Sequence, residues 1–128
     1  MNKSLFEKET LQFGDSFKSL IWIINSVKDA LKHNSVADVI YYSKYSMNLS
    51  DKLYDFLEKY NLFFEILRKK FGLDISACNS LKMGIGETKR KLQQVIIFAS
   101  EGKMDFANRL VTEIDESHQQ LYLSLIHI

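Results

Sequence analysis

The sequence predicts an all-α protein folded as an up-down-up-down antiparallel four-helix bundle. Apolar residues recur at intervals of three and four in four successive segments, and no segment alternates with the two-residue period of a strand. The 128 residues include no proline, the residue that most often interrupts a helix. Short polar turns separate the segments, so successive helices should lie antiparallel and adjacent.

The first helix is predicted to begin between Ser4 and Thr10 and to end near His33 and Asn34. Gly14 lies inside it and weakens it, because glycine in a helix costs up to about 1 kcal/mol relative to alanine. Its apolar seam keeps a heptad spacing throughout. The seam consists of Phe13, Phe17, Leu20, Ile24, Val27 and Leu31.

The second helix is predicted to be the longest, close to ~50 Å at ~1.5 Å per residue. Ser35 is its expected N-cap, with Asp38 completing a capping-box-like pair, and Gly72 supplies the stop. Two adjacent seams give it a wide apolar face. The first runs through Val39, Tyr42, Ser46, Leu49, Leu53, Phe56, Tyr60, Phe63 and Leu67, and the second through Leu53, Leu57, Tyr60, Phe64, Leu67 and Phe71.

The third helix is predicted to start at a cap on Asp74 and to close at Glu101 and Gly102. Its seam is Cys78, Leu81, Ile85, Thr88, Leu92, Val95 and Ala99. The fourth helix is expected to be much shorter than the second, and therefore truncated. Its stripe is Met104, Ala107, Val111, Ile114, His118 and Leu121.

Residues 1–122 are expected to form a single helical bundle domain, a length that gives one sizeable core. The last six residues, Leu123–Ile128, match the translation of a transposon end used to prepare sequencing libraries. We therefore expect residues 123–128 to be an adapter-derived tail on a metagenomic fragment, and they carry no functional argument.

Charge and composition exclude several classes of function. The 17 basic and 16 acidic side chains give a net charge of +1, which provides no general attraction to nucleic acid. The clusters at residues 68–70 and 89–91 are interpreted as solvated helix faces. No secretory signal is evident, and the apolar run from Leu20 to Ile24 is far shorter than the ~20 residues that span a bilayer. We expect a cytoplasmic protein with no membrane span.

No catalytic, cofactor or metal site is expected. A di-metal bundle needs two Glu-x-x-His pairs, and the chain offers only Asp115 followed by His118, which we interpret as a histidine at the bundle edge. The stretch from Gly84 to Lys89 lacks the spacing of a phosphate loop. Cys78, the one cysteine, lies on an apolar stripe. The alternative is a small ligand-binding or catalytic bundle that uses Cys78, His118 or the stretch from Gly84 to Lys89.

The chain contains more apolar residues than the four buried seams require. The segments from Leu20 to Ile24 and from Val95 to Ala99 are hydrophobic all round the helix, more than one buried seam requires. Such residues either thicken the core or form a partner surface, for which Tyr and Trp are the usual anchors. The candidate partner-binding residues are Trp22, Ile23, Tyr41, Tyr45, Ile97 and Phe98.

These features predict a non-enzymatic helical protein-interaction module. It would bind a protein partner, or itself as a homo-oligomer, through an apolar helix face. In architecture alone the predicted bundle is similar to small cytoplasmic helical adaptors and chaperones, such as the flagellar and type III export chaperones. No matching signature residues accompany that similarity, and a fold does not establish a function.

Overall fold

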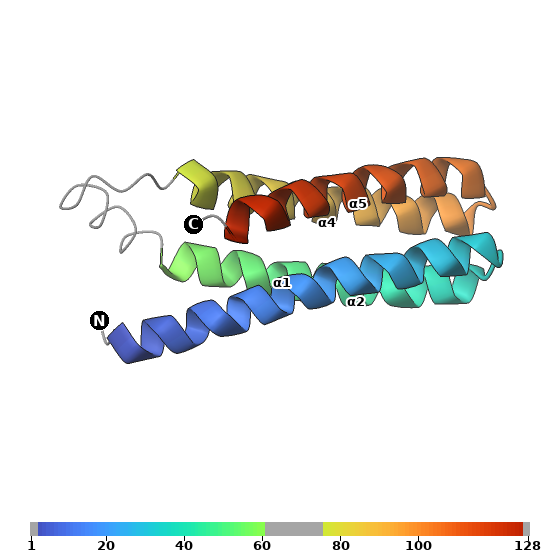
Figure 1. Cartoon of the computed structure of the whole chain (residues 1–128). Helices are drawn as coiled ribbons and strands as arrows, with labels where there is room; N and C mark the ends of the chain where they lie inside the picture. The colour runs from blue at the N-terminus through green and yellow to red at the C-terminus, as the bar shows by residue number, and fades with distance from the viewer. Residues whose placement is uncertain (1–2, 61–75, 127–128) are drawn as a thin grey trace.

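The computed structural model of the chain describes residues 3–60 and 76–126, and they form an antiparallel four-helix bundle (Figure 1). The helices are α1 (Lys3–Lys32), α2 (Val36–Lys59), α4 (Ser76–Ser100) and α5 (Met104–Ile126), and this part of the chain contains no strand. Helices α1 and α4 each contact both α2 and α5. The predicted fold class is confirmed.

The α1–α2 and α4–α5 turns lie at the same end of the bundle (Figure 1), and the same pattern of hydrogen bonds closes them. Each is closed by a residue in the left-handed region, Asn34 with φ 53° and Gly102 with φ 77°. The next backbone N–H reaches back across the last helical turn: that of Ser35 donates to Ala30 over 3.0 Å. The equivalent bond from Lys103 spans 2.8 Å. These bonds satisfy helix-terminal carbonyls, and the ends predicted near Asn34 and Gly102 are confirmed.

Alanine at two of the glycines should have opposite effects. Gly102→Ala should destabilise the protein by about 1 kcal/mol, because an L side chain is strained at a positive φ. Gly14→Ala lies inside α1, where an added Cβ meets nothing within 4 Å, and should stabilise by up to about 1 kcal/mol. Urea unfolding of both variants measures the difference, and equal shifts would contradict this account of the α4–α5 turn.

Ser35 occupies the predicted N-cap position of α2, but the predicted capping hydrogen bond is not formed. No bond joins its side chain to the first turn of the helix. Its backbone N–H is already committed to closing α1 through Ala30. That N–H is therefore not available to the Asp38 side chain, as the predicted capping box would require.

Helix α2 is shorter than predicted. It ends at Lys59, and Tyr60 follows as its C-cap. Lys82 meets Glu58 over 2.6 Å, so the end of α2 lies beside the first turns of α4. The remaining residues predicted for the end of this helix and for the cap of the next lie outside the described part of the chain. They are Phe63, Phe64, Leu67, residues 68–70, Phe71, Gly72 and Asp74.

The expected difference in helix length is not found. Helix α1 is the longest of the four at 30 residues, while α2 has 24 and α5 has 23. The expectation of a long second helix and a much shorter fourth helix is therefore wrong for the described residues. Helix α5 continues through Leu123, whose side chain is exposed, to Ile126.

The core consists of two hydrophobic clusters along the bundle axis. The cluster nearer the two turns contains Ile24, Val27, Ala30, Leu31, Val39, Leu92, Val95, Ala99, Ala107, Val111 and Ile114. The other contains Phe13, Phe17, Leu20, Leu53, Leu57, Leu81 and Ile85. All six residues of the α1 seam are buried, as predicted. The described α4 seam from Leu81 onward is buried as well.

The first predicted α2 seam is buried at Val39, Ser46, Leu53 and Tyr60, but Tyr42, Leu49 and Phe56 are replaced in the core by the residues that follow them, Ser43, Ser50 and Leu57. Ser43, Ser46 and Ser50 are buried, whereas Tyr42 and other large residues predicted to face inward are half-buried at its sides. Two of these serines bond back to the preceding turn through the hydroxyl, whereas the Ser43 hydroxyl has no hydrogen-bond partner among the described residues. Ser46 donates to the Tyr42 carbonyl over 2.9 Å, and Ser50 donates to that of Ser46 over 2.8 Å.

Candidate functional site

The largest exposed aromatic side chain lies on α1. Trp22 is 78% exposed, because the residues on either side of it in the seam, Leu20 and Ile24, point into the core. Trp22 follows Leu20 by about 200° around the helix and therefore faces outward. Tyr41 and Tyr45 of α2 are also exposed, and Ile23 is half-buried. We call Trp22, Ile23, Tyr41 and Tyr45 the tryptophan surface.

The antiparallel alignment of α1 and α2 brings Tyr45 to a level of the bundle close to that of Trp22, with Tyr41 one turn nearer the start of α2. Phe13 lies opposite Phe56, with ring centroids 4.9 Å apart. Counting from this pair, Tyr45 lies at about the level of Ile24, within a turn of Trp22 along the axis. Four of the six predicted partner-binding residues thus belong to one pair of adjacent helices.

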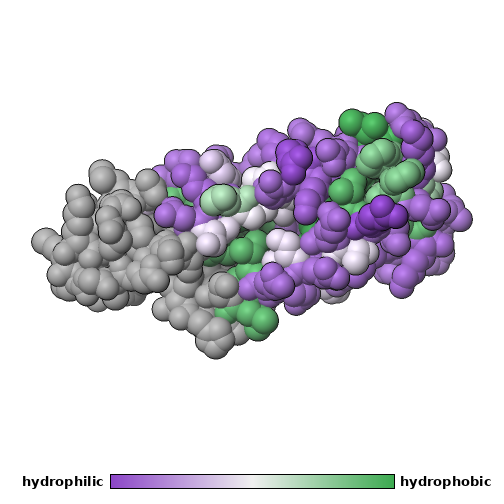
Figure 2. All heavy atoms as spheres, turned by 90° about the horizontal axis from the view of Figure 1, so that it is seen from above, coloured by the Kyte–Doolittle hydropathy of each residue, from purple (hydrophilic) through white to green (hydrophobic). Residues whose placement is uncertain are grey.

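The other two predicted residues lie on a different pair of helices. Ile97 of α4 is exposed, whereas Phe98 is half-buried and packs on the core. Phe106 of α5 is exposed, and its ring lies 5.4 Å from that of Phe98. Figure 2 shows apolar atoms gathered over α4 and α5 towards the end with the turns. We call Ile97, Phe98 and Phe106 the phenylalanine surface.

Phe106 was missed by the sequence interpretation. It lies on α5 between Met104 and Ala107, just outside the predicted buried stripe of that helix. An aromatic residue off the buried stripe is the sequence feature that could have indicated an exposed ring. Arg109 lies above the Phe106 ring, 5.9 Å from its centroid, and covers part of it. This contact places a cation at the border of the phenylalanine surface.

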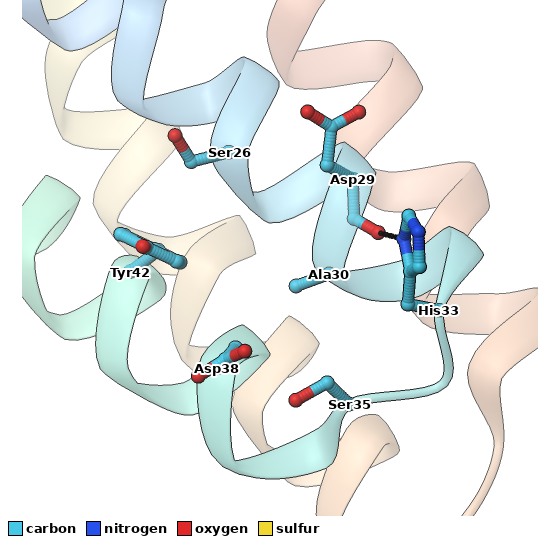
Figure 3. A pocket seen from close by; sticks show the side chains of 7 residues that line it. All are labelled: Ser26, Asp29, Ala30, His33, Ser35, Asp38 and Tyr42. Atoms are coloured by element: carbon cyan, nitrogen blue, oxygen red, sulfur yellow. Dashed lines mark hydrogen bonds between the residues drawn. The ribbon is translucent and has the colours of Figure 1, made fainter.

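A polar hollow of about 240 Å³ opens between α1 and α2 near their turn (Figure 3). Its lining is Ser26, Asp29, Ala30, His33, Ser35, Asp38 and Tyr42. The imidazole Nδ1 of His33 lies 2.8 Å from the Asp29 carbonyl oxygen. The Asp29 carboxylate points away from Ser35 and Asp38 (Figure 3), so the acidic groups do not converge on one point.

A second hollow, of about 320 Å³, lies between α2 and α4. It is lined by Ser50, Asp51, Tyr54, Ile85, Gly86 and Lys89, three of them from the stretch between Gly84 and Lys89. Lys89 is paired with Asp51 over 2.7 Å. The two charged groups of this hollow thus neutralise each other.

His118 is wholly buried, which corrects the prediction of a histidine at the bundle edge. Its Nε2 lies 2.8 Å from the Thr88 hydroxyl oxygen. Because that hydroxyl donates to the Gly84 carbonyl over 2.9 Å, the imidazole Nε2–H is the donor to Thr88. The predicted stripe of α5 passes through His118, but sequence spacing gave no indication of its partner on α4.

Burial controls the protonation of His118. Desolvation lowers the pKa of its imidazole from 6.5 to about 4, and the charge of Asp115 opposes this shift only partly. Asp115 Oδ2 accepts from Lys28 over 2.7 Å. Its Oδ1 and the Nδ1 of His118 are buried without a hydrogen bond among the described residues. His118 is therefore a neutral core residue at pH 7.

The residues of the alternative, enzymatic interpretation come together only in part. His118 meets Thr88, which belongs to the stretch from Gly84 to Lys89, but neither residue lines either hollow. The Cys78 side chain lies outside the described part of the structure. Within the described residues, no group of three acidic, histidine or cysteine side chains has the geometry to hold a metal ion.

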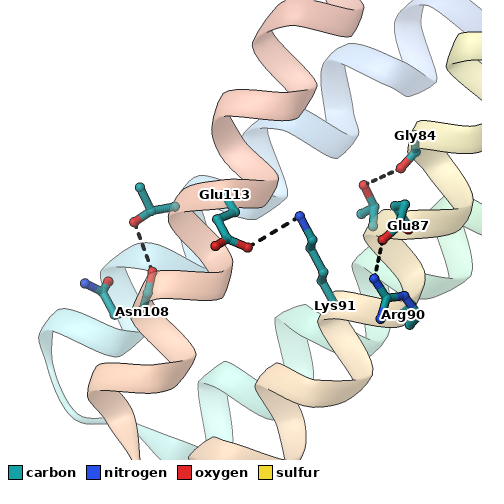
Figure 4. Close-up of polar contacts among 8 residues, drawn as sticks. Gly84, Glu87, Arg90, Lys91, Asn108 and Glu113 are labelled. Carbon is teal, nitrogen blue, oxygen red and sulfur yellow. Dashed lines mark hydrogen bonds and ion pairs between the residues drawn. The ribbon is translucent and has the colours of Figure 1, made fainter.

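The basic cluster at residues 89–91 is neutralised by acidic neighbours (Figure 4). Arg90 pairs with Glu87 over 2.6 Å, and Lys91 reaches across to Glu113 of α5 over 3.4 Å. With the bond from Lys89 to Asp51, each cation of this cluster has an anionic partner. Residues 68–70 lie outside the described part of the chain. None of the described helices is long and apolar enough to cross a bilayer.

Comparisons with known proteins add no functional information to this geometry. No family model, no curated protein and no solved structure matches the chain.

Proposed function

We propose that the protein is a non-enzymatic helical interaction module that docks a protein partner, or a second copy of itself, through the tryptophan surface. The observation that carries the proposal is the 78% exposure of Trp22 in the middle of a 30-residue helix. An indole left in water forgoes the large gain of burying an aromatic ring. A docked helix would recover that gain by covering Trp22 together with Tyr41 and Tyr45.

The phenylalanine surface is a second contact area in this proposal. It lies on α4 and α5 rather than on α1 and α2, so it would meet a different part of the partner or a second chain. The similarity in predicted architecture to small cytoplasmic helical adaptors and export chaperones favours docking of this kind. An adaptor or chaperone role in that compartment is the biological form that we propose.

Site-specific photo-crosslinking tests the proposal. A benzophenone amino acid in place of Asn25, one turn from Trp22 and exposed, should form an adduct with whatever covers this face. The matched control carries the same group in place of Glu116, which is exposed on α5. The adduct should be strong at position 25, weak at position 116, and reduced about tenfold by a further Trp22→Glu change.

The crosslinked species must then be identified and purified. A partner identified by mass spectrometry should bind the wild type about tenfold more tightly than it binds Trp22→Glu, with helicity unchanged by circular dichroism. Equal adduct yields at positions 25 and 116, or equal binding by the two proteins, would overturn the proposal.

A further inference from the structure

The outward stripe of α1 combines Trp22 with a regular arrangement of charges. At heptad spacing it contains Leu11, Asp15, Lys18, Trp22, Asn25, Asp29 and Lys32, all exposed. None of its four charged side chains forms an ion pair with another described residue. In contrast, Lys82, Lys89 and Lys91 of α4 are all paired with neighbouring helices. The charges beside Trp22 therefore have no ionic partner among the described residues and remain open to a partner chain.

The order of these charges is self-complementary in one orientation. Reading along α1, an acid and a base precede Trp22, and an acid and a base follow Asn25. In an antiparallel pair of α1 helices centred between Trp22 and Asn25, Lys18 lies opposite Asp29 of the second copy. Asp15 then lies opposite Lys32 of that copy. A twofold axis repeats both contacts, giving four ion pairs.

Other registers are disfavoured by the same charges. A parallel pair would set each charged residue against its own copy, which places acid against acid and base against base. An antiparallel pair centred on Trp22 itself would bring Asp15 opposite Asp29 of the second copy, again like charges. Of these three arrangements, only the antiparallel pair centred between Trp22 and Asn25 places every charged residue opposite a charge of the other sign.

We propose that the occupant of the tryptophan surface is a second copy of this chain, joined through antiparallel α1 helices in that register. The inference rests on the proposed function and deepens it by naming the partner. The two Trp22 Cα atoms are offset by about 4.5 Å along the axis, so the indoles lie side by side at the twofold axis. The ion pairs flank them and fix the orientation, as charges do at specific interfaces.

Charge exchange tests the register. Asp29→Lys sets Lys18 against a new cation and should weaken self-association about tenfold, whereas the double variant Lys18→Asp with Asp29→Lys should restore it. Within one chain the two positions lie about 16 Å apart along α1, too far to pair, so rescue reports a contact between chains. Glu116→Lys, a matched reversal on α5, should have no effect.

Equilibrium sedimentation of the full chain, from about 1 µM to 1 mM under reducing conditions, provides the measurement. The expected result is a concentration-dependent dimer that weakens as salt screens the ion pairs. A monomer throughout, an unaffected Asp29→Lys variant, or a double variant that stays monomeric would each overturn the inference. Circular dichroism identifies any variant that has merely unfolded, and Lys32→Asp with its partner reversal Asp15→Lys then provides the second exchange pair.

The two proposals fail in different ways. A monomeric wild type that still gives a specific adduct at position 25 with another protein would refute the second copy and leave the interaction module standing. A monomeric wild type without a specific adduct would refute both.

Discussion

Mild acidification should destabilise the fold through His118. The unfolded chain protonates this imidazole near pH 6.5, whereas the folded protein resists protonation until about pH 4. Between these values the unfolded state binds more protons, so the free energy of unfolding falls as the pH falls. The full loss is about 3 kcal/mol, of which about 2 kcal/mol is expected by pH 5.

Urea unfolding at a series of pH values between 7 and 5 measures this loss, and two histidine variants separate its origin. His118→Gln keeps a side-chain N–H for the Thr88 hydroxyl but cannot titrate, so it should lose most of the pH dependence. His33→Gln, at the exposed α1–α2 turn, should retain it. An unchanged slope in His118→Gln would show that the imidazole is not the group that responds.

Phe17→Ala should cost about 3–5 kcal/mol, the typical range for removing a buried phenylalanine. Phe17 is wholly buried, and its ring contacts side chains from α1 and α5. It lies 6.3 Å from the Phe13 ring, 5.9 Å from the imidazole of His118 and 6.4 Å from the Tyr122 ring. Removing it leaves a cavity beside the buried imidazole, which the α-helical backbone cannot close.

Trp22→Ala is the matched comparison, because it removes a larger aromatic side chain from the same helix. Trp22 is 78% exposed, so its loss should change the stability of the dilute monomer by less than about 0.5 kcal/mol. Thermal unfolding at low protein concentration compares the two variants. If Trp22→Ala were as destabilising as Phe17→Ala, the tryptophan would belong to the core and the tryptophan surface would lose its anchor.

The sequence by itself determined the fold class and most of the core. In α1 and α4 the heptad track predicted from the sequence is also the track that is buried, because it runs along the helix whereas the additional apolar residues are confined to one short segment of each helix. The α1–α2 and α4–α5 turns could also be predicted from the sequence. Asn34 and Gly102 tolerate the left-handed conformation that ends a helix, and both adopt it.

The predictions from the sequence were wrong where the buried residues are not the most hydrophobic ones. In α2 the sequence interpretation placed Tyr42 inside and could not foresee that Ser43 and Ser50 would be buried, because the spacing of apolar residues does not show which positions a neighbouring helix covers. It also extended α2 towards Phe71, since local periodicity contains no information about where the neighbouring helix begins. Both decisions depend on residues distant in sequence.

The tertiary structure alone decided which candidates became surface and which became core. Trp22 and Phe98 both lie in segments that are hydrophobic all round, yet Trp22 faces water while Phe98 packs on the core. The sequence predicted His118 to lie at the bundle edge, but the packing of α4 against α5 places the Thr88 hydroxyl 2.8 Å from its Nε2 in the core. A helix pattern defines which residues share a face, but burial is set by whether another helix covers that face, and this follows only from how the four helices meet.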